Sequence, residues 1–307
     1  MKKFYPEGVL FETKQNKKCI SSATALREAF FEDRILEARV ILCDHDHNLH
    51  VDLGEVHGII PREECAIGIS EGTVKDIAII SRVNKPVVFK IIDFIDDAGI
   101  RTAILSRRRV QEEFITNYIS QLRCGDVIDA RVSHNETFGS FCDIGCGISA
   151  LLPIDSISVS RIPHPEVRFS VNTMIKAIVK NIDNSGRVTL SHKELLGTWK
   201  ENAELFKAGQ TVGGVVRSIE KYGVFIELSP NLAGLAEFTP DVNEGDLASV
   251  YIKSINSEKM KVKLAIVDSF SADYPRPEIK YFFNNTHIDH WQYSPENSDK
   301  LIETVFQ

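Results

Sequence analysis

Hydrophobic and polar residues alternate in short runs over much of the chain, as they do in β-strands that have one buried face. The run from Val127 to Val132 alternates, and the segments FGSFCDI and GISALLP follow it. MIKAIVKNID and RVTLS come next, separated by the turn residues Asn184, Ser185 and Gly186. About five short strands at this spacing predict a small β-barrel or sandwich.

Between these β regions the apolar residues recur at helical spacing. The segments RRRVQEEFITNYISQL (107–122) and HKELLGTWKENAELF (192–206) both follow this pattern. The segment SSATALREAFFED (21–33) opens with serines, which are residues suited to cap the start of a helix. We therefore predict linker helices between the β regions and one helix ahead of the first.

The β pattern is repeated along the chain. A shift of 84 residues brings seven positions into register without a gap. The matched pairs are Gly125 with Gly209, Val132 with Val216, Phe138 with Tyr222, Gly139 with Gly223, Phe141 with Phe225, Ile144 with Leu228 and Leu151 with Leu235. A fainter copy lies upstream, where residues 130–132 match 38–40 and residues 150–153 match 58–61. Three copies in tandem predict three small β domains.

The repeat divides the chain into seven expected segments. They are an N-terminal extension with a helix (1–33), a degenerate first repeat (34–106), a linker helix (107–121), a second repeat (122–193), a second linker helix (194–206), a third repeat (207–267) and an aromatic-rich C-terminal extension (268–307). We expect the aromatic side chains of the extension to pack on the last barrel. A ligand-binding role for them is the alternative, and no specific motif supports it.

An aromatic-Gly-x-aromatic motif occurs at the same place in two repeats. It reads FGSF at 138–141 and YGVF at 222–225. Residues three apart on a regular strand face opposite sides, but a glycine between them permits a bulge that brings both rings to one face. Two exposed rings would form a stacking surface for unpaired bases. The alternative is that one or both rings belong to the core.

The repeats resemble the barrel of the S-one (S1) RNA-binding domain family, which is named for the largest protein of the small ribosomal subunit. The resemblance rests on GDV at 125–127, on FGSFCDIG, and on Ile182-Asp183 followed by RVTLSHK. The third repeat adds TVGGVV, YGVFIEL, AGLAEF and VYIKSI with KVKLA, so the resemblance covers about residues 34–266. It implies a mainly β fold of three tandem five-stranded OB-fold barrels, joined by short α-helices and followed by a C-terminal extension.

The resemblance also implies binding residues, because the family's binding face carries two aromatic residues, a His, an Asp and an Arg. In the second repeat the matching positions are Phe138, Phe141, Asp183 and Arg187, and Pro153 stands at the His position. In the third repeat they are Tyr222, Phe225 and Lys261, with Asn256 at the Asp position and Glu237 at the His position. The first repeat departs most, because His47 and His50 replace the two rings.

The charged candidates have physical roles and bland alternatives. Arg187 and Lys261 could contact phosphate or stack on a base, and Asp183 could orient the arginine or accept a hydrogen bond from a base or ribose. Each could equally be a solvated charge at a turn. Lys193 and the run 107–109 could widen a phosphate track, with a solvated cluster as the alternative.

Taken alone, the net charge argues against nucleic acid as a partner. The 307 residues hold 36 Lys+Arg and 43 Asp+Glu, a net charge of −7. The acidic excess lies in residues 34–106 (8 against 12) and in the tail 267–307 (3 against 7). Residues 122–195 (8 against 8) and 207–266 (7 against 7) are neutral. We therefore expect binding that depends more on stacking than on charge, with selectivity for single strands.

Targeting and cysteine patterns favour a cytoplasmic protein. The start MKKFYPEGVLFETKQNKK lacks an apolar stretch, and the apolar runs are shorter than the roughly 18–20 residues of a membrane span, so no membrane partner is expected. The six cysteines form no Cys-x-x-Cys pair, which is typical of reduced thiols in a chain of this length.

The prediction is a non-catalytic single-stranded RNA-binding protein of bacterial translation or RNA metabolism, with messenger RNA and the ribosome as expected partners and no cofactor, metal or catalytic residue. A protein-interaction scaffold that docks on the ribosome or another RNA machine is the alternative. A metal-dependent enzyme is a third possibility, because histidines gather at 45–57 and at 287–290.

Overall fold

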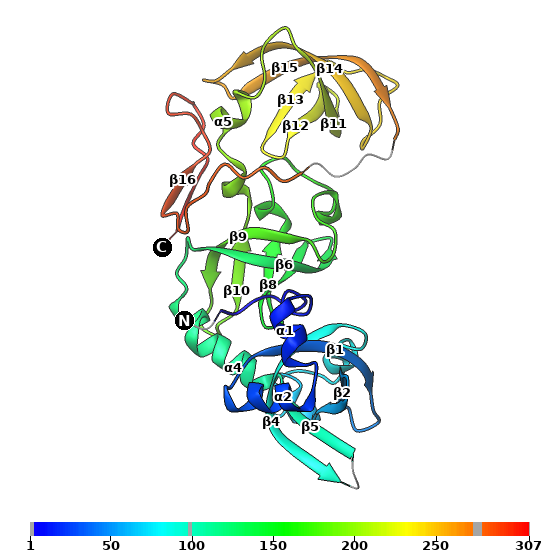
Figure 1. The fold of residues 1–307 in the computed structure, drawn as a ribbon. Helices are drawn as coiled ribbons and strands as arrows, with labels where there is room; N and C mark the ends of the chain where they lie inside the picture. Colours follow the sequence, from blue (N-terminus) through cyan, green and yellow to red (C-terminus); the bar gives the residue numbers. More distant parts are fainter. Residues whose placement is uncertain (1–2, 98–99, 273–277, 307) are drawn as a thin grey trace. The chain divides into compact units, whose positions relative to one another are not determined.

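The structure, a computed structural model, describes residues 3–97, 100–272 and 278–306. In that part of the chain three closed barrels of five strands follow one another, coloured blue to cyan, green, and yellow to orange in Figure 1. The expectation of a mainly β fold with three tandem five-stranded barrels joined by short helices is confirmed.

The strands of each barrel come in chain order. Barrel 1 consists of β1 (Leu36–Cys43), β2 (Leu49–Leu53), β3 (Val56–Ile60), β4 (Pro86–Asp97) and β5 (Ile100–Ser106). Barrel 2 consists of β6 (Val127–Glu136), β7 (Gly139–Gly145), β8 (Ile148–Pro153), β9 (Met174–Ile182) and β10 (Val188–Ser191). Barrel 3 consists of β11 (Thr211–Glu220), β12 (Gly223–Ser229), β13 (Leu232–Ala236), β14 (Leu247–Asn256) and β15 (Lys261–Phe270).

All three barrels close in the same way. The first three strands form an antiparallel meander, the third strand pairs in parallel with the fifth, and the fourth joins the fifth to the first. Alternating burial along the strands places the apolar residues inside, for example Val216 and Ile226 in barrel 3. The period-2 pattern of the sequence therefore has its ordinary cause, which is one face buried in a small core.

Short helical segments lie between and around the barrels. The α-helices are α1 (Lys14–Cys19), α2 (Ala23–Phe31), α3 (Ile77–Ile80), α4 (Arg108–Asn117) and α5 (Trp199–Ala203). The 3-10 turns are η1 (Arg62–Glu64), η2 (Ile119–Gln121), η3 (Ile154–Ser156), η4 (Pro165–Val167) and η5 (Lys193–Leu196). Ser22 caps α2 by accepting a hydrogen bond from the Ala25 N–H, as the serines at its start predict. None of the helices in the described ranges is long and apolar enough to cross a membrane.

Contacts group the chain into two compact units. Unit 1 runs to Leu122 and also includes Asp143–Ser149, while unit 2 comprises Arg123–Cys142 and the chain from Ala150 onward. The core of barrel 1 lies in unit 1 together with Leu26 and Ala29 of α2. Unit 2 contains barrel 3, most of barrel 2 and the C-terminal extension.

The extension packs as expected on the last barrel, and it also follows the edge of barrel 2. Trp291, Tyr293 and Phe306 belong to the same core cluster as the inside of barrel 3. A small sheet of β16 (His290–Gln292) and β17 (Glu303–Val305), which the sequence did not reveal, holds the extension together.

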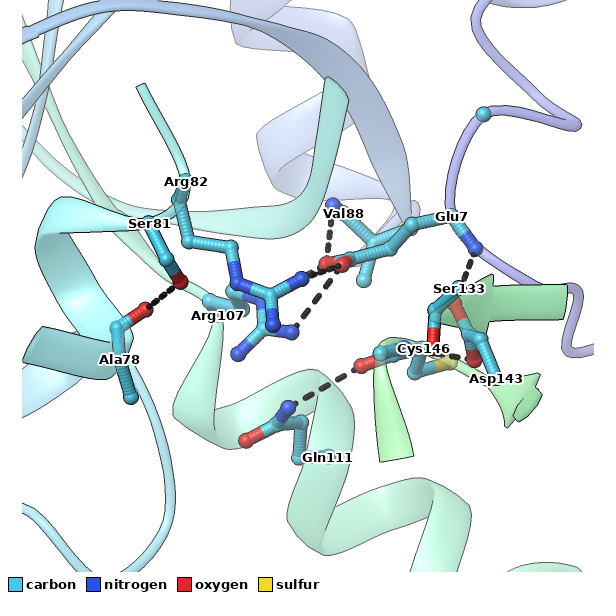
Figure 2. Close-up of polar contacts among 12 residues, drawn as sticks. Glu7, Ala78, Ser81, Arg82, Val88, Arg107, Gln111, Ser133, Asp143 and Cys146 are labelled. Atoms are coloured by element: carbon cyan, nitrogen blue, oxygen red, sulfur yellow. Dashed lines mark hydrogen bonds and ion pairs between the residues drawn. The ribbon is translucent and has the colours of Figure 1, made fainter. Parts of the chain in front are cut away.

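Unit 1 contains a cluster of buried charged groups, which Figure 2 shows. Arg107 donates hydrogen bonds to the Glu7 carboxylate from Nε (2.6 Å) and from Nη2 (3.1 Å), and Arg82 donates another from Nη1 (3.2 Å). The backbone N–H of Glu7 donates to Asp143 Oδ2 (2.7 Å). The N-terminal segment is thereby fixed to the start of the linker helix and to the tip of the β7–β8 hairpin.

Candidate nucleic-acid interface

The motif of barrel 3 places two aromatic rings together at the surface. Tyr222 occupies the two-residue turn between β11 and β12, because Glu220 pairs with Gly223. Phe225 follows on β12, and the two ring centroids are 6.1 Å apart with the planes at 90°. The Tyr222 side chain is 69% exposed and Phe225 is half-buried, so the pair offers ring surface to solvent.

Barrel 2 repeats this arrangement. Phe138 lies in the turn between β6 and β7, and Phe141 follows on β7. Their centroids are 6.0 Å apart with the planes at 86°, and Phe138 is 54% exposed. These two sets, Phe138 with Phe141 and Tyr222 with Phe225, are called the ring pairs below. The core alternative does not hold for Phe138 and Tyr222, because both are exposed.

The glycine of each motif is required by close approach of the backbone. A Cβ at Gly139 would lie 2.5 Å from the carbonyl oxygen of Leu152, and one at Gly223 would lie 2.4 Å from that of Ala236. The bulge in barrel 3 lies opposite the motif, on β11, where the register shifts between Val216 and Ser218. The glycine thus lets the turn lie against the third strand, and the bulge is supplied by the facing strand.

The charged candidates of barrel 2 lie at the turn between β9 and β10. Asp183 Oδ1 accepts hydrogen bonds from the Ser185 N–H (2.8 Å) and hydroxyl (2.6 Å) and from the Arg187 N–H (2.9 Å). The hydrogen bond from the Ser185 hydroxyl and that from the Arg187 N–H lower the pKa of Asp183. Asp183 therefore stabilises the turn from which the exposed Arg187 projects.

The corresponding positions of barrel 3 are also exposed. Lys261 begins β15 and pairs across the strand with Asn256. Glu237, at the family's His position, forms an ion pair with Lys253 (2.9 Å), and that hydrogen bond lowers the pKa of Glu237. Pro153, at the same position in barrel 2, is half-buried at the end of β8.

Barrel 1 has imidazoles at the ring positions. His50 pairs with Leu42 and Ile59 as Phe225 pairs with Ser218 and Leu235, so it stands at the position of the second ring. Its Nε2 lies 3.1 Å from Asp44 Oδ2 and its Nδ1 lies 2.8 Å from His57 Nε2. Burial and the neighbouring His50 lower the pKa of His57.

Histidine clusters give no metal site in the part of the chain that the structure describes. That part contains no group of three or more His, Cys, Asp or Glu side chains placed to hold an ion. Instead, His45 contacts Asp46, His290 contacts Glu303, and His287 lies between Asp126 and Asp289.

The interpretation of residues 107–109 as a possible phosphate track is wrong for two of the three arginines. Arg107 is buried against Glu7, and Arg108 forms ion pairs with Glu64 and Glu112. Arg109 is exposed. The sequence carried no signal for this, because Glu7 lies 100 residues from Arg107. Lys193 is half-buried, and its Nζ lies 3.5 Å from the Asp155 carbonyl oxygen.

A family model decides what the second barrel is similar to. Residues 121–193 match the S1 RNA binding domain. The resemblance to the S1 RNA-binding domain family is confirmed. Among curated proteins, the chain is 28% identical over 276 residues to small ribosomal subunit protein bS1 of Staphylococcus aureus, covering 84% of this chain and 68% of that protein. It is 27% identical over 255 residues to the bS1 of Leuconostoc lactis, covering 78% and 57%.

One solved structure aligns over a similar length. It is a multidomain protein with nucleic acid binding domains from Streptococcus pneumoniae, with 12% identity, a TM-score of 0.25, and coverage of 77% of this chain and 74% of that one.

Proposed function

We propose that this S1-like chain is a non-catalytic protein that binds single-stranded RNA by stacking bases on the ring pairs of barrels 2 and 3. The observation that supports the proposal is the recurrence of one exposed, perpendicular ring pair at the same turn of two barrels. Stacking of a base on an aromatic side chain contributes about 1–3 kcal/mol and tolerates any base sequence. The match of barrel 2 to the S1 RNA binding domain supports RNA as the ligand.

Charged residues would hold the RNA backbone beside the ring pairs. Arg187 and Lys261 are exposed cations at turns and strand ends of the two barrels, and a guanidinium or ammonium there can contact phosphate. Asp183 would act indirectly, by stabilising the turn that carries Arg187. Because barrels 2 and 3 are neutral overall, their surface favours flexible single strands over a duplex.

The relatives suggest where such binding would serve. The curated proteins that the chain resembles are named as small ribosomal subunit proteins of bacteria. We therefore propose a role in bacterial translation or RNA metabolism, in the cytoplasm, with messenger RNA as the ligand and the ribosome as a partner.

The test is a titration of single-stranded RNA into wild type and a variant with Phe138→Ala, Phe141→Ala, Tyr222→Ala and Phe225→Ala. We expect a loss of affinity of roughly a hundredfold or more, because at least two stacked bases lose their partners. The variant His50→Ala with His57→Ala is the matched control, since it removes two surface rings from barrel 1. Equal affinity of wild type and the four-residue variant, with intact folding by circular dichroism, would refute the stacking mechanism.

A second function is a docking scaffold, which the departure of barrel 1 favours. Barrel 1 lacks a ring pair, and residues 34–106 carry the acidic excess. If docking is the function, co-sedimentation with ribosomes should survive loss of both ring pairs and should disappear when residues 1–106 are removed.

A further inference from the structure

Glu227 is buried between two guanidiniums from different barrels. It lies on β12, two residues after Phe225. Arg168, from the loop before β9 of barrel 2, donates from Nη1 to Oε1 (2.7 Å) and from Nη2 to Oε2 (2.5 Å). Arg217, on β11 of barrel 3, donates from Nε (3.0 Å) and Nη2 (3.1 Å). All three side chains are 9% exposed or less, so this ion-paired contact between the barrels is shielded from water.

Asn231 makes a second buried contact between the same parts of the chain. It lies in the turn between β12 and β13, with no exposed surface. Its Oδ1 accepts from the Val159 N–H of barrel 2 (3.0 Å), and its Nδ2 donates to the carbonyls of Lys193 and Gly197 (2.8 Å each). The hydroxyl of Tyr293, in the extension, donates to the Asn231 carbonyl (2.5 Å). The Asn231 side chain therefore forms hydrogen bonds with backbone groups of barrel 2 and the linker, and the Asn231 backbone carbonyl accepts a hydrogen bond from the tail.

Apolar packing continues across the same junction. The core cluster of barrel 3 includes linker residues and tail residues, and partly buried residues of barrel 2 pack against it. Members outside barrel 3 are Ile178 of barrel 2, Leu195, Trp199 and Ala203 of the linker, and Ile288, Trp291, Tyr293 and Phe306 of the tail, and Cys124, Val127 and Val159 of barrel 2 are among the residues packed against them. Barrels 2 and 3 consequently share a core, which a freely jointed pair of domains would lack.

Buried hydrogen bonds connect this junction to the ring pair of barrel 2. Ser140, inside the FGSF motif, donates to Asn135 Oδ1 (2.7 Å), and Asn135 Nδ2 donates to the Phe169 carbonyl (2.9 Å). Phe169 directly follows Arg168, and Glu227 lies two residues after Phe225 on the ring-bearing strand of barrel 3. Each of these polar side chains is less than a tenth exposed.

From these contacts we propose that barrels 2 and 3 bind RNA as a single rigid site, in which Arg168 and Asn231 fix the relative position of the two ring pairs so that one continuous strand occupies both. The proposal rests on the proposed function, since it takes the ring pairs to bind RNA. Arg168 and Asn231 are positioning residues, because they lie in the junction and hold the barrels that carry the rings.

A rigid junction favours binding because the second ring pair then binds the same RNA strand without a further loss of conformational entropy between the barrels. Once one ring pair has bound, the other has a high effective concentration for the same strand, and this gain depends on geometry. A pre-organised pair also avoids the entropy of ordering two barrels on binding. Loss of the junction should therefore weaken long RNA and leave RNA that reaches one ring pair unaffected.

The experiment uses the full chain with Arg168→Ala and Asn231→Ala, singly and together. Arg168 is substituted and Glu227 is kept. In the Arg168→Ala variant Glu227 still forms its ion pair with Arg217, so no buried charge is left unpaired. Arg217→Ala is the matched control, since it removes the other guanidinium from the same carboxylate and leaves Arg168 in place. Circular dichroism checks folding, and ¹⁵N relaxation reports whether barrels 2 and 3 tumble together.

Affinity is measured with oligouridine of about 4 and of about 30 nucleotides, which span one and both barrels at the usual site sizes. Each variant is compared with wild type at the same length, so the number of binding registers on the strand cancels. We expect the double variant to lose roughly tenfold or more with the long RNA, to bind the short RNA as wild type does, and to show independent tumbling of the barrels. Arg217→Ala should retain joint tumbling and long-RNA affinity.

Two results would overturn the proposal. One is joint tumbling of the barrels in the double variant, which would mean that Arg168 and Asn231 do not fix the junction. The other is independent tumbling with undiminished long-RNA affinity, which would mean that rigidity contributes nothing. Failure of the proposed function is distinguishable, because removal of the four rings would then leave binding of both RNAs unchanged.

Discussion

Barrel 1 and barrel 3 have the same strand order and the same pairing register, yet they present different groups at one turn. Leu49 and Val224 are equivalent by register, so Asn48 stands where barrel 3 has Gly223. The turn of barrel 1 is longer, and Asp44 holds it by accepting from the N–H groups of Asp46 and Asn48. The OB-fold barrel therefore does not by itself create a ring pair, which requires a short turn and a glycine that lies against the third strand.

The two units also differ in the buried groups whose neutral form is favoured, which are carboxyls in unit 1 and an imidazole in unit 2. In unit 1, burial, opposed by hydrogen bonds from the N–H groups of Gly8 and Phe11, raises the pKa of Glu37 to about 7. Burial and the nearby Glu7 raise the pKa of Asp143 to about 6. In unit 2, burial lowers the pKa of His192 to about 4. Folding favours the neutral form of each group, so a change of pH should alter the stability of the two units in opposite directions.

The largest expected effect is an opposite response of the units to pH. The stabilisation from a neutral Glu37 is complete below pH 4.5 and is lost as pH rises through about 7. That from a neutral His192 is complete above pH 6.5 and is lost as pH falls through about 4. Each change is on the order of 3 kcal/mol.

Hydrogen exchange of core amides in the full chain, corrected for the intrinsic pH dependence, measures both effects. Between about pH 7.5 and pH 5, the core amides of barrel 1 should gain protection relative to those of unit 2, which contains His192. Glu37→Gln should remove the response of barrel 1 alone. Parallel responses of barrel 1 and unit 2 would contradict the assignment of these groups.

The next largest effect concerns the turn that distinguishes the barrels. Gly139→Ala and Gly223→Ala should each cost about 1–3 kcal/mol of unfolding free energy, because the new methyl group would overlap a carbonyl oxygen of the third strand. RNA affinity should fall as well, since the turn carries the exposed ring.

Gly213→Ala is the control for that substitution, because a Cβ there would meet no atom within 4 Å. Urea denaturation of the three variants gives the comparison. Equal stability of Gly139→Ala and Gly213→Ala would show that close approach is not the reason for the motif's glycine.

The smallest expected effect is the dependence of RNA affinity on salt. With Arg187 and Lys261 as the phosphate contacts, the slope of log K against log salt should be about −1.4, or roughly a sevenfold loss between about 50 and 200 mM salt. Arg187→Ala should flatten the slope by about half. A slope several times steeper would indicate many phosphate contacts and would contradict binding that depends mainly on stacking.

Local and repeated features were predictable from the sequence. The alternation of apolar residues gave the barrels, and the repeated FGSF and YGVF segments placed the ring pairs at equivalent turns. Whether these residues and Asp183, Arg187 and Lys261 bind RNA stays a prediction. The structure adds that Asp183 stabilises a turn. The spacing of Asp183, Ser185 and Arg187 is compatible with this role but does not require it.

Non-local polar contacts could not be predicted. Arg168 resembles any surface arginine in the sequence, and its partner Glu227 lies 59 residues away. Arg107 looked like part of a basic run, because Glu7 and Asp143 approach it only in the folded chain. Burial of an ion pair leaves no periodic trace, since it depends on which loops meet across a barrel and not on neighbours along the chain.

The contact between the Glu7 N–H and Asp143 has a consequence for synthesis. These residues are 136 positions apart, and the Cys146 N–H likewise donates to the Tyr5 carbonyl. During synthesis the N-terminal segment is made first, and its backbone groups have no hydrogen-bond partners here until the β7–β8 hairpin has been made. Unit 1 is therefore completed only after about half of the polypeptide has been made, although its own barrel ends at Ser106.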